Sequence, residues 1–290
     1  MKRIIGWLLL ITPMAWAAGG GLDTAKIEQL TGLKGVLNEK EGVFKVSYPR
    51  GDIHPTAGGV VVTPPMGLTA WAAFMKMGDQ DMVMGDMVLT EDQVNPVMSV
   101  ALDNGLDVTA LHNHFFWDKP KVMFMHIGGM DNETKLAGAV GKVFAQIKKG
   151  MEAPGPRQPV IDPAETSLDS KKIDVILGAK GDFNKGVYKW TWGKSTKMHG
   201  QEVGNAMGVN TWAAFVGSDV HAVVDGDFAM YESELQNVLK TLRRGNINIV
   251  AIHNHMTMEE PRVIFLHFWG IGTTQDLARA LKAALDTQIK

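Results

Sequence analysis

The stretch "ALHNHFFWDKPKVMFMHIGG", residues 110–129, decides the fold of this chain because its pattern occurs twice. Residues 251–270 read "AIHNHMTMEEPRVIFLHFWG", with the same His-Asn-His motif, the same later proline and the same third histidine. The two stretches begin 141 residues apart. A pattern that returns at such a distance indicates a chain built from copies of one structural unit.

The repeat extends well beyond the histidine motif. Residues 66–129 align with the second copy at the same offset without a gap, and "LDTAKIEQLTGLKG" at 22–35 matches "LDSKKIDVILGAKG" at 168–181. Between the copies, four prolines favour an extended linker over a helix. We therefore predict four segments: a signal peptide at 1–17, repeat unit 1 at 18–150, a proline-rich linker at 151–167 and repeat unit 2 at 168–290.

The N-terminus has the pattern of an export signal. Met1-Lys2-Arg3 is followed by the apolar run "IIGWLLLITPMAWA", which ends in a small-x-small site at Ala17. Thr12 and Pro13 interrupt the run, which is too short to span a bilayer comfortably. The chain has no cysteine, so it cannot carry a lipid on an N-terminal cysteine. We expect a periplasmic or secreted protein that is not a lipoprotein and has no membrane span.

The composition limits the class of partner. The chain is 45% apolar and 21% charged, as is usual for globular proteins. Loss of the signal peptide leaves 27 basic and 31 acidic residues, a net charge of −4, which is no electrostatic footprint for nucleic acid. We therefore expect no nucleic-acid partner, although the string "HNH" shares its name with a nuclease motif. A small molecule or an envelope component is the expected partner, and the oligomeric state is left open.

Hydrophobic patterning predicts an α+β fold, a tandem duplication of an antiparallel sheet unit covered by helices. The expected order in each unit is α-β-β-β-α-β-β-α, and we expect the two sheets to pack into one pseudo-symmetric body. A capping box at Thr90 to Gln93 marks the start of the second helix. The elements expected in unit 1 are helices at 23–30, about 91–103 and 134–148, and strands at 43–48, 68–75, 82–89, 107–116 and 121–127.

The histidines form the main candidate site. Side chains alternate along a strand, so His112 and His114 share one face, and a turn centred on Lys119 would place His112 opposite His126. Neutral imidazoles in a group of three suit zinc or another divalent transition metal, with one coordination position open. The alternative is that these histidines hydrogen-bond to the backbone and were inherited as structural residues. The predicted metal ligands are His112, His114 and His126 in unit 1, and His253, His255, His267 and His199 in unit 2.

Carboxylates and methionines offer further chemistry. Asp86 and Asp227 each follow a glycine, where they could act as a general base near a metal-bound water or serve only turn formation. The sequence assigns no catalytic residue. Thioethers bind Cu(I), and the chain has 18 methionines, but most have apolar counterparts in the other copy, which favours core filling. Met77 and Met84 have polar counterparts.

The repeated "HNH...P...F.H..G" segment, the "GVNTWAAF" strand and the "GDF" or "GDM" turn together resemble the LppY/LpqO family of exported bacterial proteins of unknown function. The resemblance covers essentially the whole chain after the signal peptide. It implies lipoproteins in some members, and this chain departs from that by lacking the cysteine. In arrangement alone, the His-x-His strand with a later histidine is similar to the zinc-binding fold group of acetolactate decarboxylase.

Taken together, these features predict an exported protein with a duplicated three-histidine site that binds zinc or another transition metal. A metal-dependent hydrolase or lyase is one functional interpretation. The alternatives are a copper-binding protein and a non-enzymatic envelope module whose ligand lies between the two units. In the latter, the candidate aromatic walls are Trp71, Trp117, Trp212 and Trp269.

Overall fold

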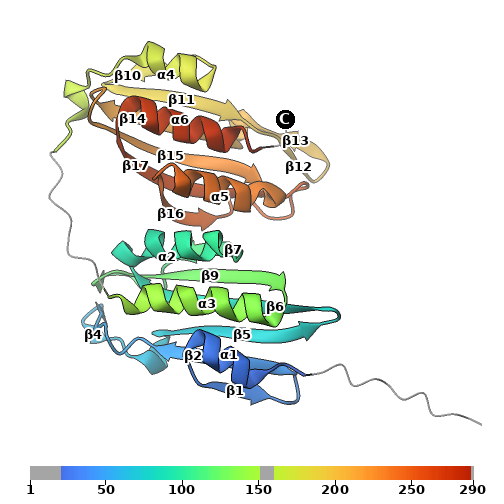
Figure 1. Cartoon of the computed structure of the whole chain (residues 1–290). Coiled ribbons are helices and arrows are strands. Elements are labelled where there is room, and N and C mark those ends of the chain that lie inside the picture. Colours follow the sequence, from blue (N-terminus) through green and yellow to red (C-terminus); the bar gives the residue numbers. More distant parts are fainter. Residues whose placement is uncertain (1–20, 151–159, 289–290) are drawn as a thin grey trace, which may run out of the picture.

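The computed structural model describes residues 21–150 and 160–288. It is an α+β structure in which helices cover one face of a twelve-stranded sheet, as Figure 1 shows. The predicted fold class and duplication are confirmed. The predicted signal peptide at 1–17 lies outside the described residues.

Each repeat unit contributes six strands to the sheet. In unit 1 the elements are α1 (Thr24–Thr31), β1 (Gly35–Asn38), β2 (Val43–Pro49), β5 (Thr69–Met77), β6 (Gln80–Thr90), α2 (Glu91–Asp103), β7 (Asp107–His112), β9 (Val122–Asp131) and α3 (Glu133–Lys148). In unit 2 they are α4 (Ser170–Leu177), β10 (Asp182–Asn184), β11 (Val187–Gly193), β14 (Asn210–Gly217), β15 (Ala222–Tyr231), α5 (Leu235–Arg244), β16 (Asn248–His253), β17 (Val263–Gly272) and α6 (Thr274–Leu285).

Short strands outside this sheet account for most differences from the predicted elements. β3 (Thr56–Ala57) pairs with β4 (Val60–Val61) and with β8 (Asp118–Lys119), and β12 (Thr196–Met198) pairs with β13 (Gln201–Val203). The strand predicted at 107–116 therefore ends early, at His112, because β8 leaves the large sheet to join β3. The edge strands β1 and β10 were not predicted. The described part of the linker contains a 3₁₀ turn, Pro163–Glu165.

The two sheets join edge to edge and do not stack on each other. β7 and β16 run antiparallel, and Leu111 pairs with Ile252. These two residues are equivalent in the repeat, so a pseudo-twofold axis passes between them. The strand order across the sheet is β1-β2-β5-β6-β9-β7-β16-β17-β15-β14-β11-β10.

Two side-chain amides extend this junction symmetrically. The Gln236 amide donates to the Val108 carbonyl at 2.9 Å and accepts from the Val108 N–H at 3.0 Å. At the equivalent place, Asn95 donates to the Ile249 carbonyl at 3.2 Å and accepts from its N–H at 2.8 Å. Where the direct backbone pairing between β7 and β16 stops, each side-chain amide pairs with a backbone N–H and carbonyl, as a neighbouring strand would. Backbone groups at a sheet edge need such partners when they are covered.

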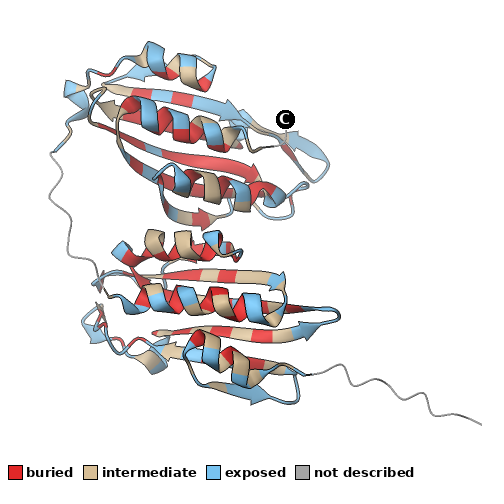
Figure 2. Ribbon diagram, viewed as in Figure 1, coloured by how far each residue is buried: buried red, intermediate tan, exposed pale blue. Residues whose placement is uncertain are grey.

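Burial follows the strand alternation. Along β5, buried residues alternate with half-buried ones, because one face meets the helices and the other does not. In unit 2, β14 alternates in the same way, whereas β15 is buried along most of its length (Figure 2). The helix-facing side holds the main core, with Phe74, Phe144, Phe215 and Phe268 fully buried. Within the part of the chain that the structure describes, no α-helix covers the other face of the sheet, which leaves its polar residues accessible for function.

Helix α3 packs very closely on α1. A Cβ at Gly141 would lie 2.1 Å from the Leu30 carbonyl oxygen, whereas a Cβ at Gly138, one turn earlier, would meet nothing within 4 Å. Only glycine at position 141 therefore permits this helix spacing. The same position becomes Lys282 in unit 2.

The junction amides can be tested by removing one of them. Gln236→Leu leaves the Val108 N–H and carbonyl without their partners, so we expect the free energy of unfolding to fall by about 2 kcal/mol. Asn237→Leu, at the exposed neighbouring position of α5, is the matched control. Urea denaturation measures both, and equal stabilities of the two variants would contradict this role of Gln236.

The two glycines of α3 give a second test. Gly141→Ala forces a methyl group against a backbone oxygen, and we expect it to destabilise the protein by roughly 1–3 kcal/mol. Gly138→Ala adds helix propensity without a clash, so it should stabilise the protein by about 0.5–1 kcal/mol. The melting temperatures of the two variants should shift in opposite directions in thermal denaturation. Shifts in the same direction would refute the close helix contact.

Candidate functional site

The histidines of both units lie on the sheet face that carries no helices. His126 stands between Met125 and Ile127, which are buried in the helix-facing core. Neighbouring residues of a strand point to opposite faces, so His126 points away from the helices. His267 is placed in the same way between Leu266 and Phe268. Because β7 and β16 are adjacent, the two histidine groups flank the pseudo-twofold axis on one common face.

The pairing of the histidines differs from the prediction. His112 pairs with Phe124 and not with His126, which pairs with Ala110. A bulge between Val108 and Ala110 and the departure of β8 move the register, so no simple hairpin turn is centred on Lys119. The histidines of the two strands still meet, but they do so diagonally: the Nε2 atoms of His112 and His126 are 3.1 Å apart.

An aspartate completes each histidine group. Asp86 on β6 pairs with His126, and Asp227 on β15 pairs with His267 in the same register. The sequence suggested these carboxylates only as a general base or as turn residues. The signal that could have found them as ligands is the repeated Gly-Asp pair at the constant offset of 141 residues, which places both on the strand beside the third histidine.

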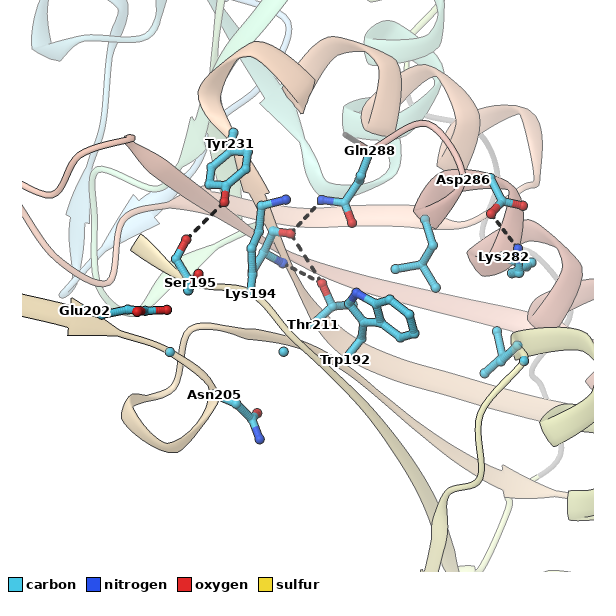
Figure 3. Close-up of a pocket in the computed structure, with 16 residues that line it drawn as sticks. Trp192, Lys194, Ser195, Glu202, Asn205, Thr211, Tyr231, Lys282, Asp286 and Gln288 are labelled. Atoms are coloured by element: carbon cyan, nitrogen blue, oxygen red, sulfur yellow. Dashed lines mark hydrogen bonds and ion pairs between the residues drawn. The ribbon is translucent and has the colours of Figure 1, made fainter. Parts of the chain in front are cut away.

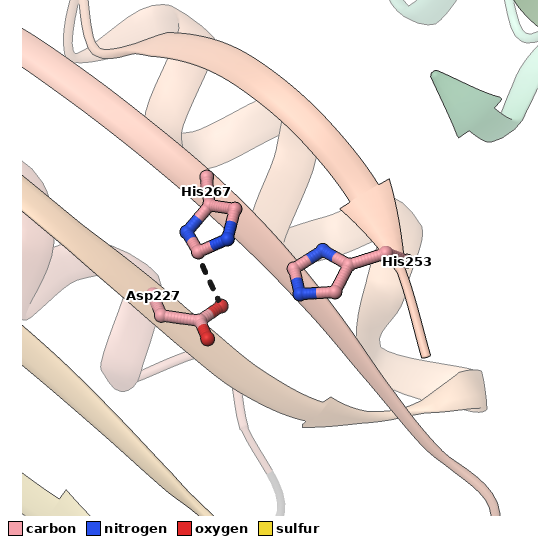
Figure 4. Close-up of side chains that lie close together, drawn as sticks. All are labelled: Asp227, His253 and His267. Atoms are coloured by element: carbon pink, nitrogen blue, oxygen red, sulfur yellow. Dashed lines mark ion pairs between the residues drawn. The ribbon is translucent and has the colours of Figure 1, made fainter. Parts of the chain in front are cut away.

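In unit 2, Asp227, His253 and His267 form a compact group. Figure 4 shows the three side chains converging from β15, β16 and β17. Each offers one ligand atom, and these atoms all lie within 4.8 Å of one another. His255, just beyond the end of β16, joins them: its Nε2 lies 3.1 Å from His253 Nε2 and 3.2 Å from Asp227 Oδ2. The His255 ring stacks on Phe265, with centroids 3.5 Å apart.

The electrostatics of this group suit a cation. Burial raises the pKa of the Asp227 carboxyl, and its neighbours His267 and His255 oppose that effect only in part. Burial, reinforced by the same two histidines, lowers the pKa of His253 to about 4. His253 is therefore neutral near pH 7, the form that binds metal. The buried Oδ1 of Asp227 accepts no hydrogen bond, which is uncommon for a carboxylate oxygen, and lies 3.9 Å from His267 Nδ1 (Figure 4). A cation between them would satisfy it.

Unit 1 repeats the arrangement with a looser geometry. Burial raises the pKa of Asp86, whose Oδ1 is also buried without a hydrogen-bond partner. His114 stacks on Phe124 with centroids 3.4 Å apart, and burial lowers its pKa. Within residues 21–150 and 160–288, however, only the group in unit 2 has three ligand atoms that all lie within 4.8 Å of one another.

The other predicted ligand, His199, is not part of this group. It lies between β12 and β13 with a positive φ of 48° and lines a separate pocket beside Met258 and Pro261. Trp71 and Trp212 flank the aspartates in register with them, and each carries a lysine over its ring. Trp117 is 83% exposed, so it forms no wall of a cleft.

The chain belongs to the family described as Domain of Unknown Function (DUF1259), whose model matches residues 25–146 and again residues 171–287. This double match agrees with the internal duplication. No curated protein matches the chain significantly. Among solved structures it is similar to a trimeric bacterial microcompartment shell protein, PduB, at 9% identity over 87% of this chain and 89% of that chain, with a TM-score of 0.21. A likeness at that level carries no argument. The resemblance to the LppY/LpqO proteins stays a prediction.

The charge of Asp227 can be tested in protein stripped of metal. A raised pKa means that the folded state holds the carboxyl proton more tightly than the unfolded chain, so ionised Asp227 costs stability at pH 7. That cost disappears as the pH falls through the folded-state pKa. We expect Asp227→Asn to raise the urea midpoint at pH 7 and the gain to vanish in acid. Asp79→Asn, at an exposed position between β5 and β6, is the control and should change little.

Proposed function

We propose that this protein binds a divalent transition metal, with zinc preferred, at Asp227, His253 and His267, and that His255 completes or flanks the site. The observation that carries the proposal is that Asp227, His253 and His267 each bring one ligand atom to within 4.8 Å of the others. His255 Nε2 adjoins them, 3.1 Å from His253 Nε2 and 3.2 Å from Asp227 Oδ2. A tetrahedral zinc ion with ligands at about 2.0–2.1 Å has neighbouring ligand atoms about 3.3 Å apart. The two contacts of His255 Nε2 are close to this distance between neighbouring ligand atoms.

Unit 1 is proposed as a second, weaker site of the same kind. The 3.1 Å contact of His112 and His126 has the spacing of one ligand edge, and Asp86 supplies the carboxylate. His114 is held on Phe124, with no contact to Asp86 that matches the pair formed by His255 and Asp227. Fewer preorganised ligand pairs mean that more ordering is required on binding, so the affinity of unit 1 is lower.

Hydrolase or lyase chemistry is compatible with this site. The side chains of His255 and His267 keep 36% and 45% of their surface exposed, so solvent reaches the ligand atoms from the open sheet face. A metal held by three protein ligands keeps a position for water, whose pKa it lowers, or for a substrate oxygen, which it polarises. With Asp227, His253 and His267 as the residues that would hold the metal, His255 would be the neighbouring group able to hold a proton. The export predicted from the N-terminus would place this chemistry in the cell envelope.

Metal analysis of tag-free protein tests the proposal. We expect one tightly bound zinc per chain after dialysis, a second equivalent only in excess metal, and a rise in thermal stability on zinc addition. His253→Ala with His267→Ala should remove the tight equivalent, and His112→Ala with His126→Ala should remove only the weak one. His54→Ala, at an exposed loop histidine, is the control. A chain that binds no stoichiometric metal, or keeps the tight equivalent in the first double variant, refutes the proposal.

Copper binding is the second candidate, and the same titration separates it from zinc. Met84 lies on β6 two residues before Asp86, hence on the same face, and it is 56% exposed. Its counterpart beside the compact group of unit 2 is Asp225, which offers oxygen and not sulfur. Cu(I) binding that depends on Met84 and exceeds zinc binding would favour copper handling over the zinc site.

A further inference from the structure

Unit 2 contains a cavity of about 900 Å³ on the helix side of the sheet, and no histidine is among its lining residues. It lies between the end of α6, the end of α4 and the strands β11 and β14 (Figure 3). Trp192, Lys194, Glu202, Lys282, Asp286 and Gln288 are among its lining residues. Its size falls within the range of small-molecule sites, about 300–1,000 Å³.

The internal repeat explains why the cavity exists. The motif "GVFK" at Gly42 matches "GVYK" at Gly186, which aligns β2 with β11. The strand register agrees with this alignment, because Phe44 pairs with Phe74 and Tyr188 pairs with the equivalent Phe215. Tyr48 and Arg50 of unit 1 therefore correspond to Trp192 and Lys194 of unit 2. On the helices, Gly141 and Phe144 correspond to Lys282 and Leu285 at the constant offset.

In unit 1 the same place is filled. Phe144 is fully buried with its ring edge against Tyr48, at 6.3 Å between centroids, and Arg50, two residues further along the chain, is also fully buried. Gly141 lets α1 approach the backbone of α3, and α3 continues to Lys148. In unit 2 a lysine replaces the glycine, a leucine replaces the phenylalanine, and α6 ends at Leu285. These differences leave Trp192 52% exposed in the cavity wall.

The lining is polar but balanced in charge. Lys194 Nζ lies 2.9 Å from Glu234 Oε2, and Lys282 Nζ lies 2.5 Å from Asp286 Oδ1. Each ammonium group thus already has a carboxylate partner, and Glu202 adds another carboxylate to the wall. An anionic ligand would have to break one of these pairs. A purely apolar ligand would strip water from the polar groups without replacing their hydrogen bonds.

Trp192 supplies an apolar platform within this polar wall. Its ring stacks on the buried Trp190, with centroids 5.9 Å apart and planes 19° from parallel, and this contact holds the indole in place. A flat apolar surface surrounded by amide, hydroxyl, ammonium and carboxylate groups matches a sugar ring, which has apolar C–H faces and a rim of hydroxyls. We propose that this cavity binds a short, uncharged oligosaccharide, with one ring stacked on Trp192.

Isothermal titration calorimetry of the full chain tests this, with chitotriose and maltotriose as neutral probes and trigalacturonic acid as the anionic probe. We expect at least one neutral probe to bind and the anionic probe to bind at least tenfold more weakly. Trp192→Ala should weaken binding of the neutral probe at least tenfold. Leu285→Phe should do the same by placing the residue of unit 1 in the cavity, and it serves as the second variant if Trp192→Ala fails to fold.

Phe116→Ala is the matched control, since Phe116 is an aromatic residue that is 76% exposed and lies outside the cavity lining. It should leave binding unchanged, as should removal of metal with EDTA, because this cavity does not use the histidine groups. The proposal is overturned if neither neutral probe binds, if trigalacturonic acid binds more tightly than both, or if Trp192→Ala and Leu285→Phe bind the neutral probe like the unaltered chain.

Discussion

The structure depends on satisfying the backbone of two edge strands, β7 and β16. Each repeat unit alone would end in an exposed strand carrying unpaired N–H and carbonyl groups, a surface prone to pair with other chains. The chain resolves this by placing the two edges together at Leu111 and Ile252. Asn95 and Gln236 then pair with the backbone groups that the short ladder leaves over.

This junction also determines where the candidate chemistry lies. His112 and His253 lie on the junction strands themselves, and His126 and His267 lie on the strands beside them, so both histidine groups lie on one open face around the pseudo-twofold axis. A third strand in each unit adds the aspartate, in register with the last histidine. The helices on the opposite face bury the residues between the histidines, which holds the strands and therefore the ligand geometry. Rigid strands position ligands more reproducibly than loops do.

The two units have kept the fold and changed its details at separate places. On the open face, His114 and His255 stack alike on Phe124 and Phe265. The short contacts differ: His255 lies close to Asp227 in unit 2, whereas His112 meets His126 in unit 1. On the helix side, exchanges at two positions of the last helix leave a cavity in unit 2 where unit 1 is closed. Each unit thus serves as an internal reference for the other, because the same backbone carries both versions.

Local periodicity and the match between two parts of the chain were enough to predict the duplication, the α+β class and the histidine pattern. The helix beginning after Thr90 follows from the same kind of local signal. The expectation that methionines fill the core holds only in part: Met87 and Met125 are buried, Met75 and Met82 are half-buried. Register and junction were decided only by the tertiary structure. A bulge near Ala110 and the diversion of β8 moved His126 from opposite His112 to opposite Ala110, and no local signal specifies such a shift. Asp227 became a candidate ligand, and His199 did not join the group, because long-range strand pairing decides which side chains meet.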